Sequence, residues 1–195
     1  MFNKEPFSLL RILAIDPGLN NTGISIFDVA VSPFKILKIH SFTLKADYLI
    51  DRSGLSDENF SERMHKRFSA REAIVGITKS YRPSVVVSES PFFDRKRPSS
   101  FATLVEVITT YFDAIVAVDP LIAFSIVEPL LVKKVLGVAG QKGKEVVIEA
   151  VSKLEVLQEA LDVPFKHLDD HAVDSIAVGY TWLTEKSGLI EKEKK

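Results

Sequence analysis

The sequence predicts an α/β domain with three layers, in which a mixed five-stranded sheet lies between two layers of helices. Two observations support this fold class. Near the N-terminus, a short apolar run and two segments that alternate apolar and polar residues are typical of strands. Later in the chain, two short apolar runs each follow a helical segment, which is typical of strands buried on both faces.

The first three strands come before any helix. Residues 12–15 form an apolar run that ends at an Asp-Pro-Gly sequence, residues 16–18, and this suits a buried strand that enters a turn. Residues 23–29 and 34–44 alternate well enough to be the next two strands. We expect the three to form an antiparallel meander.

A long helix and a central strand follow. Residues 59–81 carry apolar side chains at near-helical spacing, and Arg82 with Pro83 supplies the stop. The apolar set comprises Phe60, Met64, Phe68, Ile74, Ile77 and Tyr81. Residues 85–87 are consecutive valines, the pattern of a strand that is covered on both faces.

The rest of the chain is mainly helical. Ser99 or Ser100 is expected to cap a helix that runs to about Asp119, and residues 123–127 follow as another buried strand. The inner face of that helix is predicted to be Leu104, Val107, Ile108, Tyr111 and Ile115. Further helices are predicted at residues 129–136, 144–161 and 169–185.

Length and composition limit the possible functions. The 195 residues suffice for one domain with a full core, so we expect a single domain over 1–195 with flexible ends at 1–10 and 186–195. The net charge of −1 gives no overall attraction to nucleic acid or to an anionic membrane. The absence of cysteine excludes disulfides, thiolate metal sites and a cysteine nucleophile, and an intracellular, cytoplasmic protein is the simplest interpretation.

Neither a membrane span nor a nucleotide cofactor is expected. The longest apolar region, residues 114–132, is interrupted by four residues that suit a bilayer core poorly, namely Asp119, Pro120, Glu128 and Pro129. The glycine-containing segment 137–144 superficially resembles a phosphate loop. Its spacing misses the Walker pattern, however, and Glu145 stands where that pattern has a hydroxyl residue.

Carboxylates stand at two predicted strand ends. Asp16 ends the first strand, and Glu89 lies just past the three valines. Ligands of α/β proteins collect at such strand ends. A carboxylate there loses hydration that a bound cation or hydrogen-bond donors can replace. For each acid taken alone, a turn-forming or solvated role is the alternative.

A third acidic cluster lies where the last helix begins. Asp169 and Asp170 are expected to cap this helix, because acids in a first turn are favoured by its unpaired amides and its dipole. His171 and Asp174 are three residues apart and therefore share a face of the helix. Small apolar residues surround Asp174, so we expect it to be buried with partners. With the two strand-end acids, this pair offers three carboxylates and one imidazole, a set suited to Mg²⁺ or Mn²⁺.

Three motifs resemble the RuvC family of Holliday junction resolvases, within the ribonuclease H-like superfamily. They are Ile15-Asp16-Pro17-Gly18 with Thr22-Gly23, then Val87-Ser88-Glu89, and then His171-Ala172-Val173-Asp174-Ser175-Ile176-Ala177. Order and spacing agree over nearly the whole chain, and three motifs on elements of the expected type are a specific signal. The sequence departs from the common bacterial pattern in a longer lead before the first motif and in an acidic insertion at about 51–58.

The resemblance implies a ribonuclease H-like fold in which Asp16, Glu89 and Asp174 bind metal. It places His171 at the family's remaining catalytic position, as a metal ligand or as a proton carrier, and makes Asp170 a less favoured ligand. The implied reaction is hydrolysis of a DNA phosphodiester with two Mg²⁺ or Mn²⁺ ions in each site. One ion would help to generate hydroxide and the other would stabilise the leaving 3′ oxygen.

The resemblance also places Lys133 and Lys144 beside the scissile phosphate and makes Phe92 an aromatic wedge at the crossover. Without it, Lys133 and Lys134 are an ordinary solvated helix end. Two adjacent phenylalanines on a strand point to opposite faces, so at least one of Phe92 and Phe93 should belong to the core.

Local basic residues are the candidates for DNA contact. Arg95, Lys96 and Arg97 form a basic triplet beside the aromatic pair, and Lys134 and Lys142 flank or occupy the glycine-containing loop. A further basic stripe on the first long helix is more often merely solvated, and it consists of Arg63, Arg67 and Arg71.

We therefore expect a homodimeric endonuclease that resolves four-way junctions by paired symmetric nicks, because two sites related by a two-fold axis match a two-fold substrate. One alternative is another ribonuclease H-like nuclease that acts on flaps, forks or RNA such as ribosomal RNA precursors. Another is a catalytically inactive module that binds branched DNA, although unneeded acids beside a DNA site would repel phosphate. An actin-like ATPase fold needs two such halves, which this length does not accommodate.

Overall fold

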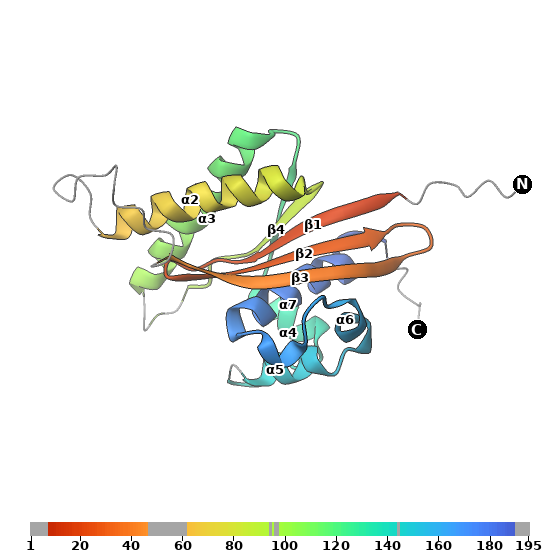
Figure 1. Ribbon diagram of the computed structural model, residues 1–195. Coiled ribbons are helices and arrows are strands. Elements are labelled where there is room, and N and C mark those ends of the chain that lie inside the picture. Colours follow the sequence, from red (N-terminus) through yellow and green to blue (C-terminus); the bar gives the residue numbers. More distant parts are fainter. Residues whose placement is uncertain (1–7, 47–61, 94, 96–97, 144, 190–195) are drawn as a thin grey trace, which may run out of the picture.

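The computed structural model describes residues 8–46, 62–93, 95, 98–143 and 145–189. Its centre is a mixed five-stranded sheet in the order β3-β2-β1-β4-β5 (Figure 1). The strands are β1 (Leu9–Asp16), β2 (Asn21–Ala30), β3 (Lys35–Lys45), β4 (Val85–Glu89) and β5 (Ala123–Val127). β1, β2 and β3 pair antiparallel as the predicted meander, whereas β4 and β5 run parallel to β1. β1 begins two residues inside the lead that was expected to be flexible.

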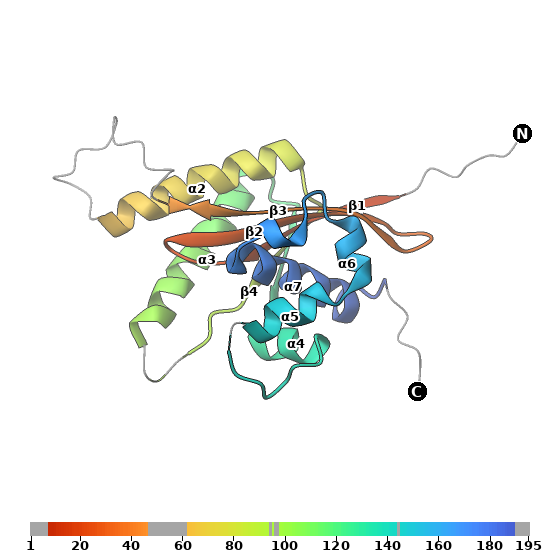
Figure 2. The same ribbon diagram turned by 60° about the horizontal axis from the view of Figure 1, so that its bottom comes forward.

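Helices cover both faces of the sheet, which confirms the predicted three layers (Figures 1 and 2). One layer contains α2 (Glu62–Tyr81) and α3 (Pro98–Val118). The other contains α4 (Pro129–Val135), α5 (Glu145–Ser152), α6 (Glu155–Ala160) and α7 (Asp170–Glu185), with a short 3₁₀ helix at Phe165–His167.

The alternation of side chains along β1 divides the core into two parts. Leu13 and Ile15 pack in the cluster beneath α2 and α3, whereas Ile12 and Ala14 pack in the cluster that contains α7. Because successive side chains of a strand point to opposite faces, Asp16 continues the row that faces α7. The fold thereby directs the last side chain of β1 toward the helix that carries His171.

α7 lies unusually close to the sheet. A Cβ atom on Gly179 would collide with the ring of Phe27, and one on Gly23 would collide with the carbonyl group of His171. Beside this contact, the buried hydroxyl of Ser25 lies 2.6 Å from that of Ser175 on α7. The small residues predicted for this helix therefore fix its first turns against β2.

The inner face of α2 differs from the prediction. Met64 and Phe68 are about half exposed, and the buried residues are His65, Ala70, Ile74 and Thr78; Phe60 lies outside the described residues. The buried row is the one that packs on α3, and this contact is formed by a helix far along the chain. The spacing of apolar residues indicated a helix correctly, but it did not indicate which side faces inward.

Two helix boundaries also differ. The helix predicted over 144–161 is broken after Ser152, and the segment that follows α6 meets the edge of β3, where Leu161 pairs with Ile39. α3 begins at Pro98, so Ser99 and Ser100 lie in its first turn rather than at the cap. Proline favours such a first position because its missing N–H would be unpaired there in any case.

α3 has one buried side and one exposed side. Of its predicted inner row, Val107, Ile108, Tyr111 and Ile115 are buried, whereas Leu104 is only partly buried. Its outer side exposes Val105, Phe112 and Val116, which are seven and four residues apart and therefore share a side of the helix. By length and composition alone α3 could cross a membrane, and no other helix among the described residues could.

Candidate active site

The four residues of the predicted acidic set come from three elements that meet at one edge of the sheet. β1 and β4 are parallel neighbours in which Ile15 pairs with Ser88, so the next residues, Asp16 and Glu89, end the two strands side by side. The first turns of α7 lie at the same edge, where His171 contacts Asp16 and the charge of Asp174 acts on Glu89. The Asp169 side chain caps α7 by accepting a hydrogen bond from the Ala172 amide at 3.0 Å, as predicted.

Asp16 and His171 are in direct contact. His171 Nδ1 lies 3.1 Å from Asp16 Oδ2, and both side chains are largely buried. On the other side of the ring, Nε2 lies 3.4 Å from the amide nitrogen of Asn21. Contacts on both sides therefore fix the orientation of the imidazole ring, while its tautomer determines which ring nitrogen donates.

Glu89 lies in a strongly unfavourable environment for a negative charge. Its pKa is raised to about 8, chiefly by burial and in addition by the nearby charges of Asp16 and Asp174. Lys133 is the group that opposes this effect. Three carboxylates thus interact with one another in a partly dry site, and a cation would relieve their repulsion.

The donor set fits a hard divalent cation. Within the described ranges no three carboxylate or imidazole groups already form a coordination shell. The raised pKa of Glu89 comes first from burial and then from the charges of Asp16 and Asp174, and a bound cation would offset both effects. Asp16, Glu89 and Asp174 offer oxygen ligands and His171 a nitrogen ligand, as Mg²⁺ or Mn²⁺ sites require.

The predicted lysines lie on or near α4. The Lys133 amino group donates to the carbonyl oxygen of Gln141 at 3.3 Å, which ties the 137–143 loop to the helix beside Glu89. Lys134 and Lys142 are exposed. Arg95 is also exposed, whereas Lys96, Arg97, Lys144 and the insertion at 51–58 lie outside the described residues.

The expectation that Phe92 or Phe93 belongs to the core is wrong. Phe92 is 58% exposed and Phe93 54% exposed. β4 ends at Glu89, so the alternation of a strand does not extend to these two residues. Phe93 packs edge-on against Phe101 of α3 with ring centroids 5.6 Å apart, whereas Phe92 has no ring contact within the described part of the chain.

The arginine stripe of α2 serves the fold. Arg63 and Arg67 both reach Glu106 of α3, at 2.7 and 3.3 Å, and Arg71 pairs with Glu72 at 2.6 Å. The two contacts to Glu106 join α2 to α3, whereas the Arg71 pair lies within α2. The stripe is therefore accounted for without a nucleic-acid partner.

Two contacts near the site have no signal in the sequence. Asn21 approaches the ring of His171 although 150 positions separate them. The Tyr111 hydroxyl lies 2.6 Å from Thr22, beside the Asp16 turn, while the apolar pattern of α3 indicated only a core role for this tyrosine. Both contacts depend on how elements meet in space.

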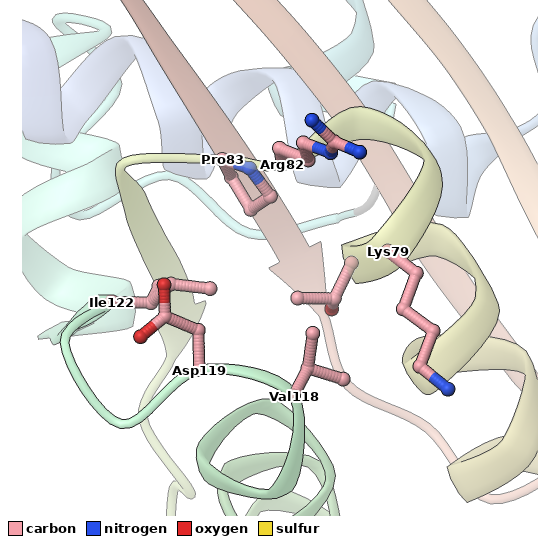
Figure 3. A pocket seen from close by; sticks show the side chains of 7 residues that line it. Lys79, Arg82, Pro83, Val118, Asp119 and Ile122 are labelled. Atoms are coloured by element: carbon pink, nitrogen blue, oxygen red, sulfur yellow. The ribbon is translucent and has the colours of Figure 1, made fainter.

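A pocket of about 370 Å³ lies at the opposite end of the sheet, where β4 and β5 begin (Figure 3). Lys79 and Arg82 lie at its rim on the side of α2, and Asp119 lies across from them. The Asp119 carboxylate accepts a hydrogen bond from the Leu121 amide at 2.9 Å, so it forms part of the turn after α3. Figure 3 shows the Lys79 amino group directed away from Asp119, and these charges do not converge on a common point.

Known structures with the same fold include several resolvases, although neither a protein-family model nor a curated protein matches the sequence. Thermus thermophilus RuvC has a TM-score of 0.57 at 20% identity, with 89% of this chain and 93% of that chain covered. The same protein in complex with Holliday junction substrate has a TM-score of 0.56, also at 20% identity and with the same coverage. The yeast mitochondrial Holliday junction resolvase has a TM-score of 0.58 at 16% identity, with 96% of this chain and 83% of that chain covered.

At these identities the likeness establishes the fold. The mixed five-stranded sheet and the two helical layers agree with the fold class expected from the sequence. The chain therefore has the ribonuclease H-like fold of the RuvC-type Holliday junction resolvases.

Proposed function

We propose that this chain is a metal-dependent DNA endonuclease that resolves four-way junctions by paired nicks. The observation that carries the proposal is the meeting of Asp16, Glu89, His171 and Asp174 at one edge of the sheet, with the pKa of Glu89 raised to about 8. The fold likeness to RuvC solved with Holliday junction substrate favours branched DNA as the substrate class.

In the proposed site, Asp16, Glu89 and Asp174 hold two Mg²⁺ or Mn²⁺ ions. Bound ions of this kind activate water and stabilise the leaving oxygen of a phosphodiester. Glu89 has to lose its proton before it binds a cation, so metal binding and proton release are coupled. His171, already held by Asp16 and Asn21, serves as a ligand or as the group that carries a proton.

Lys133 is proposed to contact the scissile phosphate. The charge of Lys133 lowers the pKa of Glu89. Its hydrogen bond to the Gln141 carbonyl keeps the 137–143 loop beside the site. Lys144, which lies outside the described residues, is proposed to contact the same phosphate. Lys142 and Lys134, with the basic residues Arg95, Lys96 and Arg97, are proposed to bind the DNA backbone. Such contacts position the DNA and make its binding sensitive to salt.

Phe92 is proposed to stack on bases at the crossover. It stands three residues beyond Glu89 and is 58% exposed. An exposed aromatic ring is an efficient platform for unpaired bases, because every base offers a face for stacking. Phe93, held by Phe101, is proposed to support the segment that carries this ring.

A homodimer is proposed to form through the exposed side of α3, with a second copy of this chain as the partner. Val105, Phe112 and Val116 form an apolar row on a helix about 30 Å long. A two-fold axis at this row would bury the same face of both copies. It would also supply the two sites that paired nicks require.

The proposed dimer surface can be tested by introducing negative charges on the exposed side of α3. Val105→Asp and Val116→Asp place carboxylates on this row, and sedimentation of the purified protein should shift from dimer to monomer. Leu37→Asp is the matched control, because Leu37 is similarly exposed but lies on β3. Unaltered protein that sediments as a monomer, or variants that remain dimeric, would contradict the proposed surface.

The nuclease function is tested with synthetic substrates. In Mg²⁺ or Mn²⁺, the purified protein should nick a four-way junction on opposing strands and leave linear duplex largely intact. The expected products carry 5′-phosphate and 3′-hydroxyl ends. Equal cutting of junctions, flaps, forks and RNA would instead favour a broader ribonuclease H-like nuclease, and binding without cutting would favour an inactive module.

A further inference from the structure

Tyr111 connects α3 to the turn that follows β1. Among the described residues, Tyr111 has the largest side chain that is fully buried, and the hydroxyl is the one polar group of that side chain. That hydroxyl lies 2.6 Å from Thr22 Oγ1, and Thr22 Oγ1 in turn lies 2.8 Å from the carbonyl oxygen of Gly18. A chain of hydrogen bonds therefore runs from the core of α3 to a point two residues beyond Asp16.

The direction of this chain follows from the protons available. A carbonyl oxygen only accepts, so Thr22 donates its single hydroxyl proton to Gly18. The Tyr111 hydroxyl then donates to Thr22, and its more distant approach to the Gly18 carbonyl, 3.5 Å, is the weaker contact. Burial raises the pKa of Tyr111 to about 12, so the phenol keeps the proton that this bond needs.

The turn is held from both layers of the molecule. Asp16 faces α7 and contacts His171, whereas Thr22 shares the opposite face of the sheet with Ile24 and with the α3 cluster. The turn itself is tight, because a Cβ atom on Gly18 would collide with the carbonyl of Asn21. A displacement at Gly18 is therefore transmitted to Asp16 rather than absorbed between them.

We propose that Tyr111 is a positioning residue for the metal site, which acts through Thr22 and Gly18 to hold the Asp16 carboxylate where a cation requires it. Tyr111 itself touches neither metal nor substrate in this proposal. The inference rests on the metal-dependent function proposed above. It predicts that cation affinity depends on a hydroxyl in the opposite helical layer.

The test is Mn²⁺ binding to the whole chain, measured by calorimetry without DNA. Tyr111→Phe keeps the ring and removes the donor, and Thr22→Val removes the relay. Each should weaken Mn²⁺ binding about 10- to 100-fold, the range typical of residues that orient a metal ligand. Thr22→Ser keeps a hydroxyl at this position and should bind Mn²⁺ like the unaltered protein. The matched control is Tyr180→Phe, which removes a half-buried hydroxyl from α7.

A double variant shows whether the two groups act together. Because Tyr111 and Thr22 belong to one chain of bonds, Tyr111→Phe combined with Thr22→Val should weaken binding little more than either change alone. A higher Mn²⁺ concentration should also restore most of the cleavage rate of each single variant. A merely structural role would lower the melting temperature and leave the Mn²⁺ affinity of the folded protein unchanged.

The outcomes separate this inference from the function on which it rests. Unchanged Mn²⁺ affinity in Tyr111→Phe, or equal losses in Thr22→Ser and Thr22→Val, would overturn the positioning role while the nuclease proposal stands. Failure of the unaltered protein to bind Mn²⁺ would overturn the metal site and this inference with it. Should Tyr111→Phe fold poorly, the two Thr22 variants decide the matter.

Discussion

The sheet carries charged side chains at both ends, and the two ends differ in how these charges are compensated. Near the start of β1, Arg11 holds Asp28 of β2 through two bonds of 2.6 and 3.0 Å and also donates to the Tyr81 carbonyl. At the other end of β1, Asp16 meets Glu89, whose pKa is raised to about 8. Opposite charges are matched at the first end, whereas acids accumulate at the second.

This difference separates charges that serve the fold from charges that await a ligand. The pKa of Arg11 is raised, chiefly by its hydrogen bond to Asp28, so folding favours its charged form. Folding disfavours the charged form of Glu89. A buried acid whose charge the protein itself does not compensate is a candidate for cation binding. The predictions that follow test this contrast.

The largest expected effect is that of Asp16→Asn set against Asp28→Asn. The first change removes a proposed metal ligand and little shape, so junction cleavage should fall by more than about 100-fold, beyond the loss typical of a residue that only supports a ligand. Junction binding should persist. Asp28→Asn should leave cleavage unchanged and lower the free energy of unfolding by about 1 kcal/mol or less. Undiminished cutting by Asp16→Asn would refute the proposed difference between the acidic end of the sheet and the charge-compensated end.

Glu89→Gln should raise the stability of the metal-free protein at pH 8 rather than lower it. The pKa of Glu89 is about 8 in the folded protein against 4.5 for the free side chain, so the folded state binds more protons between these values. The metal-free protein should therefore lose stability as the pH rises from about 5 to 8, by a few kcal/mol at about 1.4 kcal/mol per pKa unit.

Urea unfolding in chelator at both pH values measures this effect. Glu89→Gln should flatten the pH dependence and be more stable than the unaltered protein at pH 8. Glu149→Gln is the control, because the exposed Glu149 pairs with Lys153 and its pKa is lowered rather than raised. A pH dependence that survives in Glu89→Gln would assign it to another group.

Lys133→Ala should slow cleavage about 10- to 100-fold, the scale of losing one well-placed charge from a transition state. Lys133 lowers the pKa of Glu89, so its removal raises that pKa. The acidic limb of the pH–rate profile should then move to higher pH. The adjacent Lys134→Ala is the matched control and should leave that limb in place.

The smallest expected effects separate Phe92 from Phe93. Phe92→Ala should reduce cleavage, and the fluorescence of a base analogue at the crossover should report less unstacking, with the melting temperature unchanged. Phe93→Ala should instead lower the free energy of unfolding by about 0.5–1.5 kcal/mol, because it removes the ring pair with Phe101. A large loss of stability in Phe92→Ala would show that its ring is structural.

Periodicity in the sequence predicted the order and type of the main elements, because strands and helices leave different spacings of apolar residues. It did not predict which side of α2 is buried. Met64 and Phe68 fit the helical repeat as well as Ile74 does, yet only Ile74 is fully buried, in the cluster beneath α2 and α3. The spacing likewise did not predict the break between α5 and α6, after which Leu161 pairs with Ile39 of β3.

The sequence by itself determined the candidate acids, because Asp16 and Glu89 follow apolar runs and His171 and Asp174 share a helical face. Tertiary structure alone decided the contacts near these acids, namely the Asn21 contact to His171 and the hydrogen bonds from Tyr111 through Thr22 to Gly18. It also decided that Arg63 and Arg67 form ion pairs with Glu106. Spacing along the chain records only local geometry. Hydrogen bonds and charge interactions depend on distances in space, and these are fixed only when separate elements pack together.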